Sequence, residues 1–451
     1  MTKRKTAAIV LAAGLGTRMK SGLPKALHPL AGLPMIRHPI ALLEGLSLER
    51  IVAVVGAGMD TLKTLVLPHA SVIQKERLGT AHAALTARNA LKGFDGDILV
   101  MFADTPLIRP ETIERMLAAR RAKPHPAVVV LGFRPAEPGA YGRLVMGPDG
   151  MLEAIVEAKD ATPAQLEIDF CNSGVVAVDS KWLWRLLDKV GTKNAQKEFY
   201  LTDIVGIARA RGLAVAAVEG DPAELLGINS RADLAAAEAV LQGRLRARAM
   251  ANGATLMDPA SVTFSADTRL GRDVTVEPNV FFGPGVVVGN DVVIRAFSHL
   301  EQARIADGAI VGPFARLRPG ADIGRGAHIG NFVEIKNAII EPGAKANHLS
   351  YIGDARVGAD ANIGAGTITC NYDGFDKHHT DIGRGAFIGS NTALVAPVKV
   401  GDGAVVGAGS VIARDVPKDA LALTRAPVKE VPGWALHNRD RKNKKKRKKG
   451  A

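Results

Sequence analysis

Cysteine and aromatic residues are scarce in this sequence. Its 451 residues include only two cysteines, Cys171 and Cys370, and 4% of the residues are aromatic. Two thiols exclude a disulfide-stabilised scaffold and a zinc site built from cysteines, and they favour a reducing cytoplasm. Long apolar runs are absent as well, because none reaches the roughly 18 residues that cross a bilayer.

The N-terminus resembles a secretory signal over its first residues only. Lys3, Arg4 and Lys5 precede the apolar run 7–13, which is the order found in signal peptides. Glycines and cations follow at once, and no small-residue cleavage pattern is present. We therefore expect a soluble, cytoplasmic protein with no transmembrane segment.

Glycine and positive charge are in excess. The 48 glycines are about 11% of the chain, against roughly 7% in average proteins. The formal net charge is +13, which raises nucleic-acid binding as an alternative function. Residues 439–451, RDRKNKKKRKKGA, account for +8 of this charge. Because this tail has no aromatic residues and no hydrophobic pattern, we expect it to be disordered and to make no specific contact with nucleic acid.

The first half of the chain has an alternating pattern. Short β-branched runs at 7–13, 50–56, 98–104, 127–133, 174–179 and 214–220 alternate with helical periodicity at 35–46, 80–91, 111–121 and 181–190. Continuous apolar strands between helices predict a mostly parallel sheet covered on both faces. Ligands of such sheets bind beyond the carboxyl ends of the strands. Residues 230–252 then predict a helix that links two domains.

A six-residue period governs the second half. Aliphatic or aromatic anchors recur every six residues in the series 264–300, 305–335, 357–363 and 382–412, and glycine often follows the anchor. Such a period is typical of a parallel β-helix, in which three hexads make one coil and the anchors stack inside. Gaps at 336–356 and 365–381 break the rhythm, and insertions in a solenoid frequently carry the binding face. The predicted parts are 1–229, the helix 230–252, the β-helix domain 253–425 and a C-terminal segment 426–451.

A glycine-rich loop follows the first predicted strand. Residues 11–25 read LAAGLGTRMKSGLPK, which matches neither a dinucleotide fingerprint nor a Walker A loop. Arg18 and Lys25 bring two cations to the loop, which suits a triphosphate. Asp104 ends a predicted buried strand, where a carboxylate and substrate phosphates together suit Mg²⁺.

The loop closely resembles the signature of sugar-phosphate nucleotidyltransferases. Further matches are QKERLGTAHA at 74–83, FADTPLI at 102–108, YGR at 141–143, VEAKD at 156–160, NSG at 172–174 and GINSR at 227–231. The resemblance implies Mg²⁺ on Asp104 and Asn229, and transfer of a nucleotidyl group from UTP to a sugar 1-phosphate. It implies that the nucleotide and the nucleotide sugar contact Leu11, Gly14, Arg18, Lys25, Gln74, Gly79, Thr80, Gly142, Glu157, Asn172 and Asn229. Ala103 departs from the family, which has glycine there, and we expect a slightly narrower pocket.

The gaps in the hexad pattern carry polar residues. His348 suits a general base near neutral pH, Glu334 is a candidate for orienting it, and Arg316, Arg318 and Lys336 offer cations for a sugar phosphate. The strings RLRPGA, GNFVEIKNA, NHLSYIGDA and NIGAGTITCNYDG resemble the bacterial bifunctional glucosamine-1-phosphate N-acetyltransferase and N-acetylglucosamine-1-phosphate uridyltransferase family. This resemblance covers both halves and implies a Rossmann-like nucleotidyltransferase domain followed by a left-handed parallel β-helix.

The second resemblance also implies roles for individual residues. His348 is the implied catalytic base of acetyl transfer from acetyl-CoA to glucosamine 1-phosphate, a step towards peptidoglycan and lipopolysaccharide precursors. The implied amino-sugar ligands are Arg318, Lys336, Tyr351 and Asn362, and the implied acetyl-CoA ligands are Ala365, Asn371, Tyr372, Ser390, Ala408 and Arg425. The family assembles as a homotrimer with acetyl-transfer sites between subunits.

Two alternatives remain beside the bifunctional enzyme. The β-helix of a pyrophosphorylase can serve assembly or regulation alone, but His348, Tyr351 and the NYDG loop are not needed for that. A nucleic-acid-binding protein is the other alternative, and it rests on the basic tail only. His378 and His379 lack carboxylate or cysteine partners for a metal, and Cys370 is interpreted as a small buried side chain with a reactive thiol, not as a nucleophile.

Overall fold

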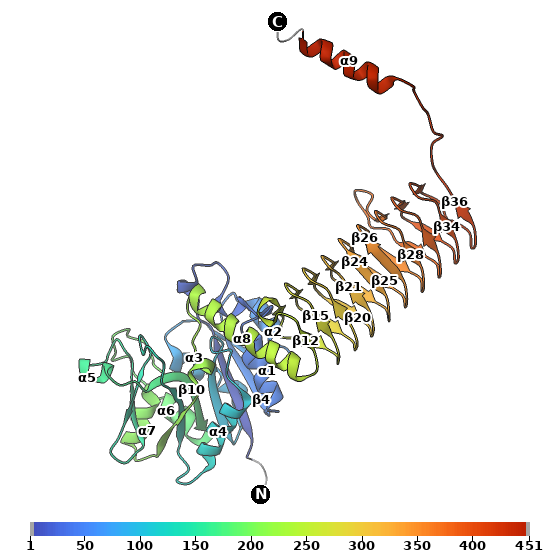
Figure 1. Ribbon diagram of the computed structural model, residues 1–451. Coiled ribbons are helices and arrows are strands. Elements are labelled where there is room, and N and C mark those ends of the chain that lie inside the picture. The colour runs from blue at the N-terminus through green and yellow to red at the C-terminus, as the bar shows by residue number, and fades with distance from the viewer. Residues whose placement is uncertain (1–3, 448–451) are drawn as a thin grey trace. The chain divides into compact units, whose positions relative to one another are not determined.

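The computed structural model describes residues 4–447 and divides into two compact units. The first unit runs to Ala251 and includes Thr263–Thr268, and the second comprises Asn252–Val262 and the chain from Arg269 onward. Figure 1 shows an α/β region followed by a coiled β region. No helix within residues 4–447 is long and apolar enough to cross a membrane.

A mixed β-sheet forms the centre of the first unit. The strand order is β11-β7-β10-β6-β1-β4-β5, with β8 and β9 as a hairpin attached through β10. All neighbours on this path are parallel except β10, which runs antiparallel to both β6 and β7. The strands are β1 (Thr6–Ala12), β4 (Arg50–Gly56), β5 (Ala70–Gln74), β6 (Asp97–Phe102), β7 (Val128–Phe133), β8 (Arg143–Met146), β9 (Leu152–Val156), β10 (Cys171–Asp179) and β11 (Val215–Glu219), and β2 (Pro29–Leu30) pairs with β3 (Leu33–Pro34) outside this sheet.

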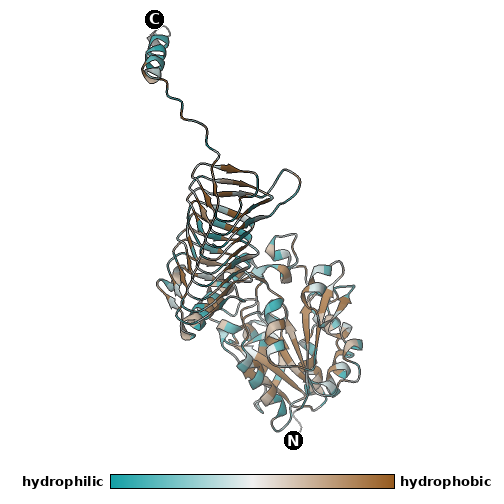
Figure 2. Ribbon diagram, turned by 90° about the vertical axis from the view of Figure 1, so that its right-hand side faces the viewer, coloured by the Kyte–Doolittle hydropathy of each residue, from teal (hydrophilic) through white to brown (hydrophobic). Residues whose placement is uncertain are grey.

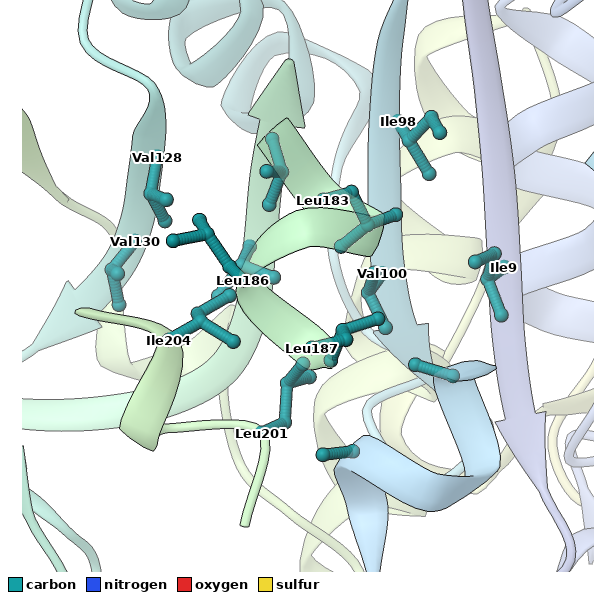
Figure 3. Packing of buried hydrophobic residues seen from close by; sticks show 14 of the residues in the cluster. Ile9, Ile98, Val100, Val128, Val130, Leu183, Leu186, Leu187, Leu201 and Ile204 are labelled. Carbon is teal, nitrogen blue, oxygen red and sulfur yellow. The ribbon is translucent and has the colours of Figure 1, made fainter. Parts of the chain in front are cut away.

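Helices cover both faces of this sheet. One core packs Leu183, Leu186 and Leu187 of α6 against Ile9 of β1 and Val100 of β6, as Figure 3 shows. A second core lies on the opposite face, where α1 packs against β1 and α4 packs against β7, β10 and β11. The helices are α1 (Arg37–Gly45), α2 (Asp60–Leu65), α3 (Thr80–Thr86), α4 (Pro110–Arg121), α5 (Pro163–Leu166), α6 (Ser180–Leu187) and α7 (Asp203–Ala210).

The six predicted strands of the first unit are present, each within a few residues of its predicted bounds. The predicted helix 80–91 is divided into α3 and a 3₁₀ turn at Asn89–Leu91. Sequence patterning missed β5, the β8–β9 hairpin and α7. Strand β5 was missed because it lies at the sheet edge, where Ala70 and Ile73 are exposed and the apolar run is interrupted.

A buried ion cluster ties the amino end of β6 to its neighbours. The Asp97 side chain is fully buried and accepts from the Nε atoms of Arg4 and Arg120 at 2.9 Å and of Arg121 at 2.8 Å. Arg120 is itself 4% exposed and also donates to Asp179 at 2.8 Å. The carboxylate is thus paired and hydrogen-bonded, as a buried charge requires.

Helix α8 (Arg231–Ala251) closes the first unit. Its Ala237 packs with Leu30, Met35 and Ile228 in a small third core. The buried amide of Gln242 donates to Phe264 O at 2.6 Å and accepts from Phe264 N at 2.9 Å. These bonds fix the segment Thr263–Thr268 on the helix, which explains why it clusters with the first unit.

A left-handed parallel β-helix forms the second unit. One face is the ladder β12 (Thr255–Leu256), β15 (Thr275–Val276), β18 (Val293–Ile294), β21 (Ile310–Val311), β24 (His328–Asn331), β26 (Lys345–His348), β28 (Asn362–Ile363), β31 (Phe387–Ile388), β34 (Val405–Val406) and β36 (Leu421–Ala422). The other faces contain β14 (Arg269–Leu270), β16 (Phe281–Phe282), β17 (Val287–Val288), β19 (His299–Leu300), β20 (Ala303–Ile305), β22 (Arg316–Leu317), β23 (Ala321–Ile323), β25 (Glu334–Ile340), β27 (Tyr351–Val357), β29 (Ile368–Cys370), β30 (Thr380–Ile382), β32 (Ala393–Val395), β33 (Val398–Val400) and β35 (Val411–Ile412), while β13 (Thr263–Phe264) belongs to the first unit.

The six-residue period follows from this geometry. Every predicted anchor is buried except Leu270, which is half-buried, so the anchors fill the interior of the coil. Figure 2 shows hydrophobic residues concentrated on the strands of both units. Corners between the faces use left-handed backbone, at glycines such as Gly312 (φ 101) and also at Phe297, Phe314 and Phe332.

The C-terminal segment differs from the prediction. We expected disorder in the basic tail, but residues Trp434–Arg447 form the helix α9. Lysine, arginine, alanine and leucine are good helix formers, and an exposed helix keeps the like charges in water. Residues 448–451 of the predicted tail lie outside the described residues.

Candidate functional site

A cavity of about 290 Å³ lies at the carboxyl edge of the sheet in the first unit. Strands β1 and β6 are parallel neighbours, so the residues that follow both strands meet at this edge. The lining is Leu11, Ala12, Ala13, Gly14, Lys25, Ala26, Gln74, Arg77, Gly79, Thr80, Ala83, Phe102, Ala103, Asp104 and Glu198. The structure therefore brings seven predicted residues into one cavity, and it adds Arg77 and Glu198, which the sequence analysis missed. Ala103 is in the wall and is 3% exposed.

Two oxygens and two cations meet at the rim of this cavity. Lys25 Nζ forms an ion pair with Asp104 Oδ2 and donates to Asn229 Oδ1 at 3.1 Å. Arg18 Nη2 donates to the same Asn229 oxygen at 2.9 Å. A backbone hydrogen bond of 2.9 Å from Ile228 N to Asp104 O brings the Asn229 loop beside the end of β6.

The oxygens of Asp104 and Asn229 suit a hard cation. Both already converge on one ammonium group, that of Lys25. Within residues 4–447 no group of three or more His, Cys, Asp or Glu could hold a metal ion. Mg²⁺ is commonly held by one or two protein oxygens together with substrate phosphates and water. The two oxygens of Asp104 and Asn229 therefore fit a metal ion that binds together with a nucleoside triphosphate.

Two residues that the predictions did not include hold the Asn229 loop. Asp233 Oδ2 accepts from the backbone N–H groups of Asn229 at 2.9 Å and Ser230 at 2.8 Å. Tyr141 accepts from Gly227 N at 3.3 Å, and its ring packs edge-on against Phe133. Tyr141 stands in the quoted string YGR, and the signal for Asp233 was an acidic residue in the first turn of the helix, which sequence alone assigns to capping.

Three of the predicted nucleotide-sugar contacts, Gly142, Glu157 and Asn172, form a second wall. A smaller cavity of about 90 Å³ is lined by Glu157 and Asn172, and it shares Thr80 and Phe102 with the first cavity. Gly142 joins this wall because its carbonyl accepts from Asn172 N at 2.8 Å. Burial raises the pKa of the Glu157 carboxyl; the Thr202 hydroxyl, which donates to it at 3.2 Å, opposes this rise, and nearby Asp160 adds to it.

In the second unit, a hydrogen bond orients His348. His348 Nδ1 lies 2.7 Å from Asn331 Oδ1, and the two residues are register partners on β26 and β24. An amide oxygen only accepts, so Nδ1 carries the ring proton and Nε2 keeps a lone pair toward solvent. An exposed imidazole fixed in this tautomer can accept a proton through Nε2.

Glu334 does not orient His348, contrary to our expectation. Its carboxylate pairs with Arg318 at 2.8 Å and with Arg316 at 3.7 Å. It lies on β25, on a different face of the coil from β26, so the residue that acts on His348 is Asn331. Asn331 lies in the quoted string GNFVEIKNA, but its contact with His348 was not predicted, because the two residues are 17 positions apart and meet through the register of the coil.

Asp354, on β27, forms a hydrogen bond with Asn371, one of the residues predicted to bind acetyl-CoA. Its carboxylate accepts from Asn371 Nδ2 and from Asn337 Nδ2, and Asn371 Nδ2 lies 3.5 Å from the Tyr351 hydroxyl. Burial alone would raise the pKa of Asp354, but the two amide hydrogen bonds and the Lys377 charge bring it below its ordinary value. Asp354 thus stays ionised at neutral pH and fixes Asn371, a role that the sequence analysis did not predict.

The remaining predicted residues occupy equivalent positions on successive coils of the β-helix or lie on neighbouring strands. Ala365, Ser390 and Ala408 each come two residues after the register-aligned anchors Ile363, Ile388 and Val406, and His348 takes the same position after Ala346. Lys336 lies on β25 opposite Gly353, and Asn362 lies on β28 opposite Lys345. Within residues 4–447 no hydrogen bond joins His348 to Tyr351, Lys336 or Asn362.

The loop after β29 carries Tyr372 and the paired histidines. The Tyr372 hydroxyl donates to Gly374 O at 2.6 Å, and the side chain is exposed. His378 Nε2 lies 2.8 Å from Asp373 Oδ2, which holds the pKa of Asp373 well below its usual range. His378 therefore has a carboxylate partner, which we did not expect, although no group of three or more His, Cys, Asp or Glu among the described residues could hold a metal ion.

Comparison with known proteins supports the fold and family of both units. Residues 8–166 match the MobA-like NTP transferase domain, and residues 267–302, 302–337 and 379–414 match the bacterial transferase hexapeptide repeats. "Bifunctional protein GlmU" of Paramagnetospirillum magneticum is 61% identical over 449 residues, which is 100% of both chains. The chain belongs to the bifunctional GlmU family. Relatives of the same name from Rhodospirillum rubrum (64% identical, 96% of both chains) and Azorhizobium caulinodans (55% identical, 99% of this chain and 100% of the other) extend over both units.

Proposed function

We propose that this chain catalyses two successive steps of UDP-N-acetylglucosamine synthesis. The second unit acetylates glucosamine 1-phosphate with acetyl-CoA, and the first unit then transfers UMP from UTP to N-acetylglucosamine 1-phosphate. Full-length membership of the GlmU family supports the pairing of the two activities. The proposal places the enzyme in the reducing cytoplasm, which agrees with Cys171 and Cys370 as free thiols.

Acetyl transfer uses His348 as the general base. Its Nε2 takes a proton from the amino group of the sugar while Asn331 holds Nδ1. As this proton leaves, the amine nitrogen attacks the thioester carbonyl and the new C–N bond forms; the C–S bond then breaks, and the His348 imidazolium gives the proton to the sulfur, which leaves as the thiol of CoA. Arg318, Lys336, Tyr351 and Asn362 hold the amino sugar in this proposal, and Ala365, Asn371, Tyr372, Ser390, Ala408 and Arg425 line the acetyl-CoA groove.

Uridylyl transfer relies on positioning and charge neutralisation. An oxygen of the sugar phosphate attacks the α-phosphorus of UTP, and the bond to pyrophosphate breaks. Arg18 and Lys25 neutralise the phosphates, while Gln74, Gly79 and the residues around them hold the base. Asp104 and Asn229 would hold a Mg²⁺ ion, which would supply charge stabilisation on the phosphate oxygens. We assign no general base, since a phosphate monoester is already ionised at neutral pH.

The observation that carries the proposal is the meeting of Asp104, Asn229, Arg18 and Lys25 beside the cavity that Asp104 and Lys25 line. It is tested by incubating the chain with glucosamine 1-phosphate, acetyl-CoA, UTP and Mg²⁺. UDP-N-acetylglucosamine and pyrophosphate are expected, and omission of acetyl-CoA stops their formation unless N-acetylglucosamine 1-phosphate is supplied. If product forms only when N-acetylglucosamine 1-phosphate is supplied, and not from glucosamine 1-phosphate and acetyl-CoA, the β-helix has no acetyltransferase activity.

The proposal also includes assembly into a homotrimer. Phe297, Phe314 and Phe332 stack along one corner of the β-helix with ring centroids 4.9 and 5.0 Å apart, and all three are about half exposed. Leu349 continues this row next to His348 and is 61% exposed. Such an apolar row supports contact with another copy of the chain. Light scattering of the purified protein distinguishes a trimer of 47.4 kDa chains from a monomer.

A further inference from the structure

The amide of Gln74 is held from two sides in the nucleotide cavity. Its Nε2 donates to the carbonyl oxygen of Gly79 at 3.2 Å and to Nδ1 of His82 at 3.1 Å. A carbonyl oxygen only accepts hydrogen bonds, so the amide atom that faces Gly79 is the nitrogen. The Gln74 side chain ends β5 and is 3% exposed, which leaves the amide little freedom.

The Gly79 carbonyl is itself fixed. Gly79 has φ 116, and a Cβ at this position would lie 2.5 Å from Phe199 O. Phe199 N donates to Leu78 O at 2.8 Å, and Ala81 N donates to Phe199 O at 2.9 Å. Two backbone hydrogen bonds therefore hold the turn that carries the Gly79 carbonyl against a second segment of the unit, so this carbonyl is a fixed acceptor for the Gln74 amide.

The orientation of the Gln74 amide determines which of its atoms a nucleotide base contacts in the cavity. Both protons of Gln74 Nε2 are directed to protein acceptors, and Oε1 accepts no hydrogen bond from the residues described by the structure. Gln74 lines the cavity together with Gly14 and Thr80, so it offers the ligand an acceptor. N3 of uracil carries a proton and can donate to Oε1, whereas N3 of cytosine is an acceptor and repels it.

We propose that His82 is a specificity-determining residue that acts through Gln74: its Nδ1 locks the amide so that the cavity selects a uracil-type base over a cytosine-type base. The inference rests on the proposed function, because it requires a nucleoside triphosphate in this cavity. His82 lies on α3, held by the helix and by the hydrogen bond of 3.0 Å from Thr86 Oγ1 to its carbonyl. If the Gln74 amide rotated by half a turn, its Oε1 would face two other acceptors, Gly79 O and His82 Nδ1. Loss of His82 Nδ1 removes one of these two unfavourable contacts.

The test measures binding of UTP and CTP by calorimetry in the presence of Mg²⁺, with the full-length chain. Three variants separate the acceptor from the bulk of the ring. His82→Leu and His82→Gln remove the acceptor at the Nδ1 position, and His82→Asn keeps one there through Oδ1. Acetyl transfer by the second unit checks that each variant chain is intact, and wild-type turnover of UTP with N-acetylglucosamine 1-phosphate tests the proposed function separately.

The wild-type protein is expected to bind UTP more tightly than CTP. The ratio of the CTP to the UTP dissociation constant should fall about fivefold in His82→Leu and His82→Gln, as expected for one neutral hydrogen bond. It should stay within about twofold of wild type in His82→Asn. The inference is overturned if the wild type binds both nucleotides equally, if His82→Leu and His82→Gln weaken both nucleotides together, or if His82→Asn loses as much selectivity as His82→Leu.

Discussion

The hydrogen bond between Asn331 and His348 gives a quantitative prediction for acetyl transfer. Asn331 Oδ1 lies 2.7 Å from His348 Nδ1, and this contact alone selects the tautomer with a free Nε2. In Asn331→Leu the ring divides between two tautomers and rotates freely. Loss of one such bond costs about 1 to 1.5 kcal/mol, which is about a five- to thirteenfold drop in kcat at 1.36 kcal/mol per factor of ten.

The assay follows release of the CoA thiol from acetyl-CoA and glucosamine 1-phosphate. Asn331→Asp is the matched control, because a carboxylate still accepts from Nδ1. It is expected to keep the activity at high pH and to move the acid limb of the pH profile upward, since the new charge stabilises the imidazolium. Uridylyl transfer by the first unit should be unchanged in both variants. An Asn331→Leu enzyme within twofold of wild type would refute the reasoning.

Three further predictions concern other parts of the chain. Asp354→Asn should lower acetyl transfer about tenfold by releasing Asn371, whereas an unchanged kcat would remove Asp354 from the account. Asp97→Ala leaves Arg120 buried without its main partner and should cost about 3–5 kcal/mol in urea unfolding; a loss below about 1 kcal/mol speaks against it. Burial raises the pKa of Glu157, so its contribution to stability is full below the ordinary value of 4.5 and is lost as pH rises through the folded value. Glu157→Gln should remove that slope from unfolding curves recorded between pH 4 and pH 8.

Much of the fold is predictable because its signals are local. The six-residue period predicts which side chains point into the coil, and all of these anchors except Leu270 are buried. The continuous apolar runs likewise predict the central strands of the first unit. The antiparallel direction of β10 is different, since it depends on the connection that returns through the β8–β9 hairpin. No residue within the run 174–179 carries that information.

The sites are predictable where a motif is contiguous and not where the coil or the sheet assembles them. Asp104, Lys25 and Gly79 stand in recognisable strings, and the structure brings them together. Asn331 and His82 also stand inside quoted strings, but their contacts with His348 and Gln74 arise through strand register and through a turn, which the strings do not reveal. The α9 helix was missed for another reason, because charge density argued for disorder while residue propensity favours a helix.

The central claim is that two separate sites in one chain act in sequence, and Asp104→Asn tests it most directly. The variant is incubated with glucosamine 1-phosphate, acetyl-CoA, UTP and Mg²⁺, and the products are identified by mass spectrometry. We predict that N-acetylglucosamine 1-phosphate and free CoA accumulate and that no UDP-N-acetylglucosamine forms, whereas His348→Ala makes UDP-N-acetylglucosamine only from supplied N-acetylglucosamine 1-phosphate. Formation of UDP-N-acetylglucosamine by Asp104→Asn, or absence of the acetylated sugar, would contradict the account.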